Sequence, residues 1–100
     1  MAGPAGAESE VIYRVTVQGR VTGVGFRFTA VYQAQQRAGL TGYVRNVDAS
    51  TVECVVRGPE SSVSSFLKWL RHGPPGARVD VCHVIPVNAC EPFTHFGVRY

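Results

Sequence analysis

The most constraining feature of this sequence is a pair of strand-like segments separated by only a short polar break. Leu40–Val47 and Thr51–Arg57 flank that break at Asp48, Ala49 and Ser50, and apolar residues alternate along the second segment. Alternation with a period of two is typical of a strand with one buried face. Two strands joined so closely must pair as an antiparallel hairpin, so the sheet that contains them cannot be wholly parallel.

Periodic segments on both sides of this hairpin complete the element order βαββαβ. Val11–Val17 alternates as a half-buried strand does. Phe26–Ala38 has the composition and apolar spacing of a helix, which Gly39 closes. The later elements are a helix that starts at Pro59 and Glu60 and ends at Arg71 and His72, a strand at Arg78–Ile85, and a last strand at Phe93–Tyr100.

This order predicts an α+β fold, a ferredoxin-like βαββαβ sandwich in which two helices lie on a mostly antiparallel sheet. A chain of 100 residues with 45% apolar content suits one domain, which we assign to residues 11–100. Residues 1–10 are small and acidic without an apolar run, which predicts a disordered tail and no secretion signal. No segment reaches the length of a membrane span, so we expect a soluble, cytoplasmic monomer without a membrane partner.

The charge of the chain indicates which kind of ligand it can bind. The net charge is +3, and nine of the ten basic residues are arginine. This suits a small phosphate or carboxylate ligand, whereas nucleic acid needs a denser basic patch and is not expected.

Cys54, Cys82 and Cys90 lack C-x-x-C spacing and are interpreted as reduced packing residues, with a Cys82–Cys90 bridge left open. No metal is expected, because ligand spacing is absent among the three histidines, His72, His83 and His95.

The first candidate site is the glycine-rich segment between the first strand and the first helix. Glycines allow tight turns that point amide N–H groups inward, and the helix start adds unpaired amides and a positive dipole end. Such a cradle binds phosphate, and an arginine in the first helical turn can add two charge-assisted hydrogen bonds. The alternative is a plain glycine turn with a surface arginine. The segment consists of Gly19, Arg20, Val21, Thr22, Gly23, Val24, Gly25, Phe26 and Arg27.

Two familiar phosphate motifs do not fit this segment. The G-K-[ST] sequence of the mononucleotide P-loop is missing. Gly23-Val24-Gly25 begins a dinucleotide fingerprint, but Phe28 stands where the third glycine belongs. The antiparallel hairpin also contradicts the parallel sheet of a Rossmann fold, so we discount that interpretation.

The second candidate is Asn46, at the end of the strand that precedes the hairpin turn. Its carboxamide can donate to one group and accept from another, so it can hold a water in line with a bound phosphorus, although it cannot remove a proton. The alternative is an asparagine that only serves the turn. In the predicted fold this residue can lie close to the glycine loop.

At these two segments the chain resembles acylphosphatase. The loop of that family runs glycine, any residue, Val-Gln-Gly-Val, any residue, Phe-Arg, and residues 19–27 fit it at every fixed position but one. The second family motif, Gly-aromatic-Val-basic-Asn, matches residues 42–46. Similarity continues through Gly58-Pro59-Glu60, Trp69 and residues 96–100, so it covers nearly everything after the tail.

The resemblance implies a cofactor-free hydrolase of small acyl phosphates, with inorganic phosphate as product and inhibitor. It implies that Arg27 and the loop amides bind the phosphoryl group and that Asn46 orients the attacking water. It implies no metal. These roles agree with the anion cradle and the water-orienting carboxamide inferred from the residues alone.

Two departures from the family pattern leave alternatives open. Thr22 replaces the usual glutamine, so a side-chain bond that braces the loop is expected to be lost, and Ser50 replaces a turn glycine and is expected to adopt a positive φ. A weakly active or inactive binding module is therefore the main alternative. An acylphosphatase-like module of the kind found in larger carbamoyl-transfer proteins is another. An RNA-binding domain is disfavoured because Thr51–Arg57 carries no aromatic residue for base stacking.

Overall fold

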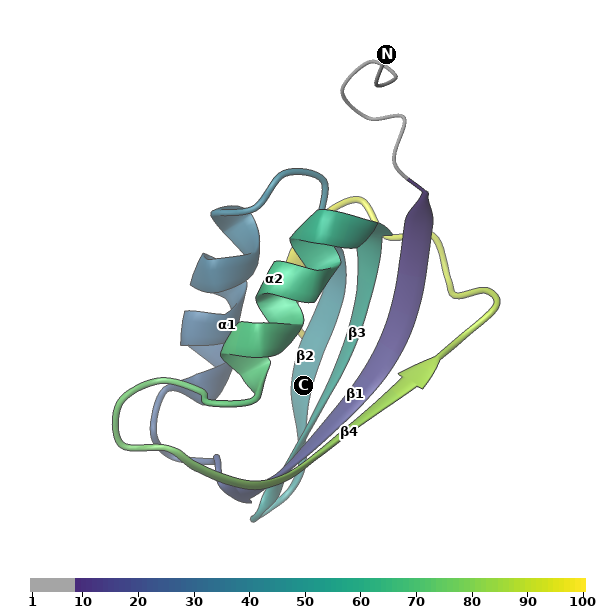
Figure 1. Ribbon diagram of the computed structural model, residues 1–100. Helices are drawn as coiled ribbons and strands as arrows, with labels where there is room; N and C mark the ends of the chain where they lie inside the picture. Colours follow the sequence, from purple (N-terminus) through teal and green to yellow (C-terminus); the bar gives the residue numbers. More distant parts are fainter. Residues whose placement is uncertain (1–8) are drawn as a thin grey trace.

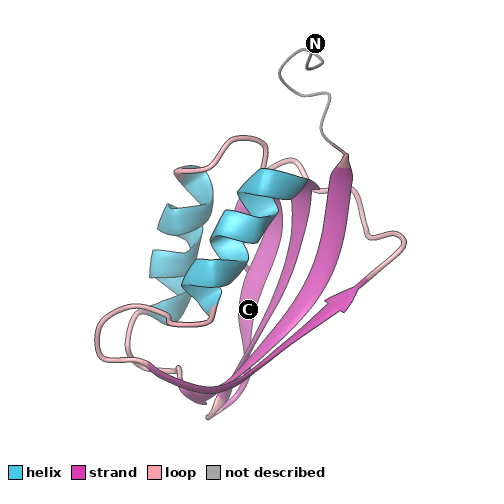
Figure 2. Cartoon of the chain, viewed as in Figure 1, coloured by secondary structure: helices cyan, strands magenta, loops and turns pink. Residues whose placement is uncertain are grey.

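In a computed structural model that describes residues 9–100, the strands form one five-stranded sheet in the order β4-β1-β3-β2-β5. Figure 1 shows β1, β3 and β2 side by side, with β4 beside β1. Both helices lie on the same face of this sheet (Figure 2). The predicted two-layer arrangement is confirmed. The elements are β1 (Glu10–Arg20), α1 (Phe26–Gln35), β2 (Thr41–Asp48), β3 (Thr51–Pro59), α2 (Glu60–Leu70), β4 (Arg78–Pro86) and β5 (Phe96–Val98).

The sheet is antiparallel except at one edge. β1 pairs with β3 and β4, and β2 pairs with β3, all antiparallel, whereas β5 runs parallel to β2. The sequence predicted five strands, one more than the order βαββαβ contains; the fifth is β5, which is much shorter than the predicted Phe93–Tyr100. The residues before it leave the sheet because Phe93 packs against Tyr43 on the face without helices, with ring centroids 5.9 Å apart.

The alternating pattern of the sequence builds the core. α1 packs on β2 and β5, and α2 packs on β1 and β3. Each fully buried aliphatic or aromatic side chain contributes roughly 1.5–3 kcal/mol through burial. The core consists mainly of Val15, Val17, Val44, Val52, Cys54 and Val56 from the strands and of Phe26, Ala30, Ala34, Val63, Phe66 and Leu70 from the helices.

The ends of several elements differ from the predicted ones by a few residues. The clearest difference is α1, which ends at Gln35, short of the expected Ala38. The α-helical hydrogen-bond pattern gives way there to a 3₁₀-type turn, since the amide of Arg37 donates to the carbonyl of Ala34 three residues earlier. Gly39 then adopts φ +77°, as expected of a glycine that follows a helix.

The predicted N-terminal tail falls largely outside the described residues, which exclude 1–8. Its last two residues join the folded domain: the carbonyl of Ser9 accepts a hydrogen bond from the amide of Glu60, and Glu10 begins β1. Glu10 also forms an ion pair of 3.1 Å with Arg57. Within residues 9–100, no helix is long and apolar enough to cross a membrane.

All three cysteines are free thiols. Cys82 pairs with Val17 of β1 and so shares the helix-covered face. Cys90 lies near Arg14, on the opposite face. The bridge left open by the sequence is therefore absent, and burial raises the pKa of the Cys54 and Cys82 thiols. Cys54 in the core and Cys82 packed against it agree with the interpretation as packing residues, whereas Cys90 does not belong to the core cluster.

Candidate active site

The glycine loop spans the gap between the end of β1 and the start of α1. Val21 and Phe26 anchor its two ends in the core, where both are almost completely buried. Gly23 and Gly25 adopt φ +71° and +75°, a left-handed conformation that costs a residue with a side chain about 1–2 kcal/mol. Two glycines and two buried anchors therefore fix the path of the loop.

Hydrogen bonds brace the loop against the hairpin turn between β2 and β3. The hydroxyl of Thr22 donates to the carbonyl of Ala49 at 2.5 Å, and the amide of Gly19 donates to the carbonyl of Ser50 at 3.0 Å. The expectation that Thr22 would leave the loop without a bracing side-chain bond is wrong. A threonine reaches the turn because the β2–β3 turn lies directly beside the loop.

Ser50 also departs from expectation. Among residues 9–100, no residue other than glycine has a positive φ, so Ser50 introduces no left-handed strain. Instead, the amide of Ser50 donates to Oδ1 of Asp48 at 2.9 Å, in the manner of an Asx turn. This backbone hydrogen bond, helped by one from the Thr51 side chain, lowers the pKa of Asp48.

Arg27 stands in the first turn of α1, where its guanidinium carbon lies 5.2 Å from the ring centroid of Tyr100 and 5.8 Å from that of Phe28. It is half-buried and makes no ion pair within residues 9–100. The first backbone hydrogen bond of α1 runs from Thr29 to Gly25, so the amides just before Thr29 have no carbonyl partner within the helix. A free guanidinium and a helix start thus meet at one place.

Asn46 lies on the helix-covered face of β2, next to the bulge that precedes the hairpin turn. It lines a cavity of about 160 Å³ together with Arg27. The fold therefore brings the two predicted catalytic residues to one cavity from different elements. The other residues around this cavity are Val21, Thr22, Gly23, Gly25, Phe26 and Phe28.

Three residues of the predicted glycine-rich segment, Gly19, Arg20 and Val24, do not line the cavity, and Phe28, outside the predicted segment, does. Arg20 is exposed at the end of β1, and Val24 packs its side chain against the core. Phe28 was missed. The signal for it lies in its position two residues after the start of α1, because side chains in a helix lean back toward the N-terminus.

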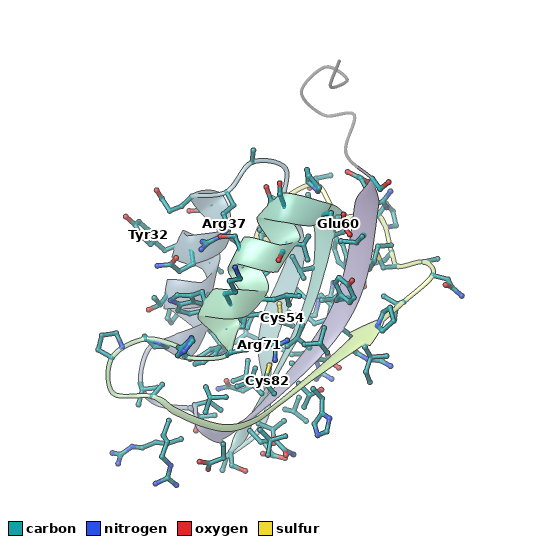
Figure 3. All side chains as sticks on the ribbon, in the orientation of Figure 1. Tyr32, Arg37, Cys54, Glu60, Arg71 and Cys82 are labelled. Carbon is teal, nitrogen blue, oxygen red and sulfur yellow. The ribbon has the colours of Figure 1, made fainter. Side chains whose placement is uncertain are left out.

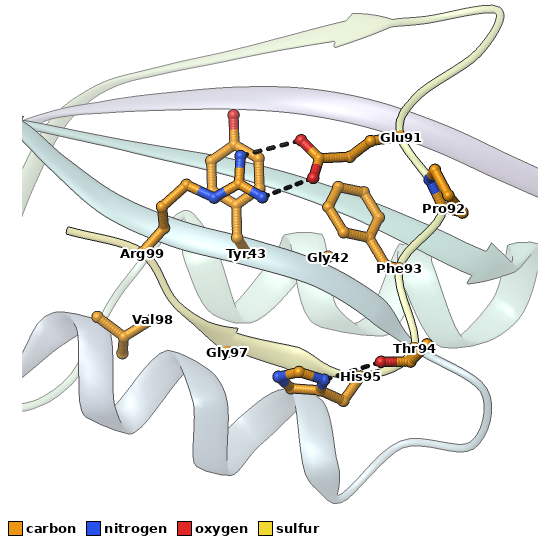
Figure 4. Close-up of a pocket in the computed structure, with 10 residues that line it drawn as sticks. All are labelled: Gly42, Tyr43, Glu91, Pro92, Phe93, Thr94, His95, Gly97, Val98 and Arg99. Atoms are coloured by element: carbon orange, nitrogen blue, oxygen red, sulfur yellow. Dashed lines mark hydrogen bonds and ion pairs between the residues drawn. The ribbon is translucent and has the colours of Figure 1, made fainter.

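A larger cavity of about 280 Å³ lies beside β5, between β2 and the segment before β5 (Figure 4). Its arginine is already neutralised: Arg99 donates to both carboxylate oxygens of Glu91, at 3.0 and 2.8 Å, and lies 4.0 Å from the ring centroid of Tyr43. A bound phosphate would have to compete with that bidentate carboxylate. The cavity that contains Arg27 is the better anion site.

The sheet face opposite Asn46 is held by a polar cluster. Glu53 of β3 accepts hydrogen bonds of 2.8 Å from the hydroxyl of Tyr43 and from the guanidinium of Arg45, both on β2. Partial burial alone would raise the pKa of Glu53, but together these hydrogen bonds outweigh it and lower the pKa. The cluster fixes β2 on β3 in the register that places Asn46.

The described residues contain no group of three or more histidine, cysteine or acidic side chains able to hold a metal ion. The three histidines are exposed and lie in separate parts of the chain. His72 follows α2, His83 is on β4, and His95 precedes β5.

Comparison with known proteins relates the chain to one family. A family model described as acylphosphatase matches residues 13–98. The chain is 48% identical over 93 residues to an acylphosphatase of Caldivirga maquilingensis, covering 92% of this chain and 97% of that one. Its structure resembles the crystal structure of an acylphosphatase from Bacillus subtilis with a TM-score of 0.84 and 36% identity, over 90% of this chain and 99% of that one. It also resembles a part of HypF from T. kodakarensis, with a TM-score of 0.78 and 31% identity, over 90% of this chain and 12% of that one.

Proposed function

The chain belongs to the acylphosphatase family, and from that premise we propose that it hydrolyses acyl phosphates in the cavity between the glycine loop and Asn46. The activity itself follows from the family: the protein is an acylphosphatase, a hydrolase that acts on a carboxyl-phosphate anhydride and releases carboxylate and inorganic phosphate. The observation that carries the assignment of the site is that an unpaired Arg27 and the carboxamide of Asn46 share one cavity.

The phosphoryl group binds to Arg27 and to the amides of the loop and helix start. The guanidinium is free to donate two hydrogen bonds because no carboxylate in residues 9–100 pairs with it. The bracing of Thr22 to Ala49 holds the loop in place before substrate arrives. Donors fixed in this way stabilise the charge that develops on the phosphoryl oxygens without further reorganisation.

Asn46 orients the attacking water. Its carboxamide oxygen accepts a hydrogen bond from the water, and the oxygen of the water attacks phosphorus in line with the bond that breaks between phosphorus and the carboxyl oxygen. The bonding electrons leave with the carboxylate, which needs no protonation. The proton of the water passes to a phosphoryl oxygen of the substrate, so no side chain has to act as a base.

The structure also bears on the alternative of a weakly active or inactive module. That alternative rested on Thr22 and Ser50, and both residues support the loop through hydrogen bonds to or from the turn. We further propose that the protein acts as a monomer, because one chain supplies every residue of the site. We place it in the cytoplasm because three free thiols suit a reducing compartment.

The test is hydrolysis of benzoyl phosphate in EDTA, with inorganic phosphate as competitive inhibitor. Asn46→Ala is expected to lower kcat by about 100-fold or more while leaving phosphate inhibition within about twofold. Arg27→Ala is expected to abolish both turnover and phosphate inhibition. Arg14→Ala, an exposed arginine on the other face of the sheet, is the matched control for lost charge.

Equal loss of phosphate inhibition in Arg27→Ala and Asn46→Ala would contradict the assigned roles. Wild-type protein that is folded, yet neither turns over substrate nor binds phosphate, would contradict the proposed site as a whole.

A further inference from the structure

Phe28 combines two properties that a purely structural residue does not need. Its side chain is 62% exposed, and it lines the cavity that holds Arg27 and Asn46. Burying a phenylalanine side chain stabilises a fold, and here the fold leaves most of that stabilisation unused. An exposed ring at the rim of an anion cavity is suited to contact the non-phosphate part of a ligand.

The size of the cavity indicates where that part of the ligand must lie. Its volume of about 160 Å³ is below the roughly 300–1,000 Å³ of pockets that enclose whole small ligands. At about 30 Å³ per water, it holds a phosphoryl group and an attacking water with little to spare. The acyl group of a bound substrate therefore has to leave the cavity and lie along its rim.

The rim next to Arg27 is aromatic. The guanidinium lies within 6 Å of the ring centroids of Phe28 and Tyr100. A ring over the face of a guanidinium leaves the in-plane N–H groups free, so these contacts do not compete with a phosphate. Tyr100 is 90% exposed and does not line the cavity, so of these two rings only Phe28 is both exposed and part of the cavity wall.

We propose that Phe28 forms an acyl-group subsite that makes this protein favour aromatic acyl phosphates over small aliphatic ones. The inference rests on the proposed function, because it takes the phosphoryl group to sit beside Arg27. An aromatic acyl group stacks offset or edge-on against the Phe28 ring and covers apolar surface on both partners. An acetyl group offers the ring only a methyl group, so it covers much less of the Phe28 ring than an aromatic acyl group does.

The test compares kcat/KM for benzoyl phosphate and acetyl phosphate in wild type and Phe28→Ala. Aromatic pairs are stabilised beyond the surface area that they bury, so we expect the benzoyl value to fall about five- to tenfold. The acetyl value and the inhibition constant for inorganic phosphate should stay within about twofold. Phe28→Tyr keeps the ring and should restore the preference.

Tyr32 provides the matched control. It lies one helical turn after Phe28, is 59% exposed, and does not line the cavity (Figure 3). Tyr32→Ala removes an exposed aromatic side chain from the same helix and should leave the benzoyl-to-acetyl ratio unchanged. Thermal unfolding of each variant shows that α1 is intact.

The outcomes separate the inference from the function on which it rests. If kcat/KM in Phe28→Ala falls equally for both substrates, or falls for neither, the acyl subsite is overturned. Wild-type turnover would still support the proposed function. Wild-type protein that hydrolyses neither substrate and does not bind phosphate overturns the proposed function itself. A wild-type ratio that favours acetyl phosphate also overturns the subsite.

Discussion

Replacing Thr22 with valine tests whether the loop needs its brace. Valine keeps the β-branched shape of threonine and removes only the hydroxyl that donates to the carbonyl of Ala49 at 2.5 Å. A neutral hydrogen bond is worth about 0.5–1.5 kcal/mol, and the partly exposed turn lets water replace some of it, so about 0.5–1 kcal/mol is expected. If this energy holds the loop in its binding conformation, the inhibition constant for phosphate rises about two- to fivefold.

The assay is phosphate inhibition of benzoyl phosphate hydrolysis, measured together with urea unfolding. Thr22→Ser retains the hydroxyl and controls for the altered side-chain size. The expected pattern is weaker phosphate binding and lower kcat/KM in Thr22→Val, with wild-type behaviour in Thr22→Ser. If phosphate inhibition and kcat/KM are unchanged in Thr22→Val, the bond to the turn does not position the loop and the reasoning fails.

Two further predictions concern the strand that carries Asn46. Gly42 has φ +140°, and an added Cβ would overlap the carbonyl oxygen of Val55, so Gly42→Ala should lose more than about 3 kcal/mol in urea unfolding. Gly76→Ala, where nothing lies within 4 Å, should cost about 1–2 kcal/mol, and similar losses in both would refute the clash. Glu53 has a lowered pKa, so its stabilising contribution is present at pH 7 and is lost as the pH falls below about 4.5 through its folded-state pKa. Unfolding free energies at pH 7 and pH 3 should therefore differ less in Glu53→Gln than in wild type, and an equal difference would count against the cluster.

The fold could be predicted because its signals are local. Alternation in the strands, apolar spacing in the helices and the short break at Asp48 each constrain the chain within a few residues, and together they leave little choice of topology. The last strand was predicted too long because its length depends on a distant contact. Phe93 packs on Tyr43, and no pattern within residues 93–100 records that partner.

The same distinction between local signals and distant contacts explains how much of the site could be predicted. Arg27 and Asn46 could be picked out because their motifs carry recognisable chemistry, and the fold brings them together at one cavity. The expectations for Thr22 and Ser50 failed because each was judged alone against a family pattern. Both residues act through the contact between the loop and the hairpin turn, which depends on how β1 pairs with β3.

The contact between the loop and the hairpin turn also explains how a small domain can hold the residues of the site at fixed positions. Arg27 belongs to α1 and Asn46 to β2, so their separation would change with any shift of the helix against the sheet. The hydrogen bonds from Gly19 and Thr22 to the hairpin turn tie the loop before α1 directly to the turn that follows Asn46. The proposed mechanism orients a water and a phosphoryl group without a base or a metal, so it depends on such positioning more than on the acidity of any group. The hairpin turn is therefore as much a part of the proposed active site as the loop to which we assign phosphate binding.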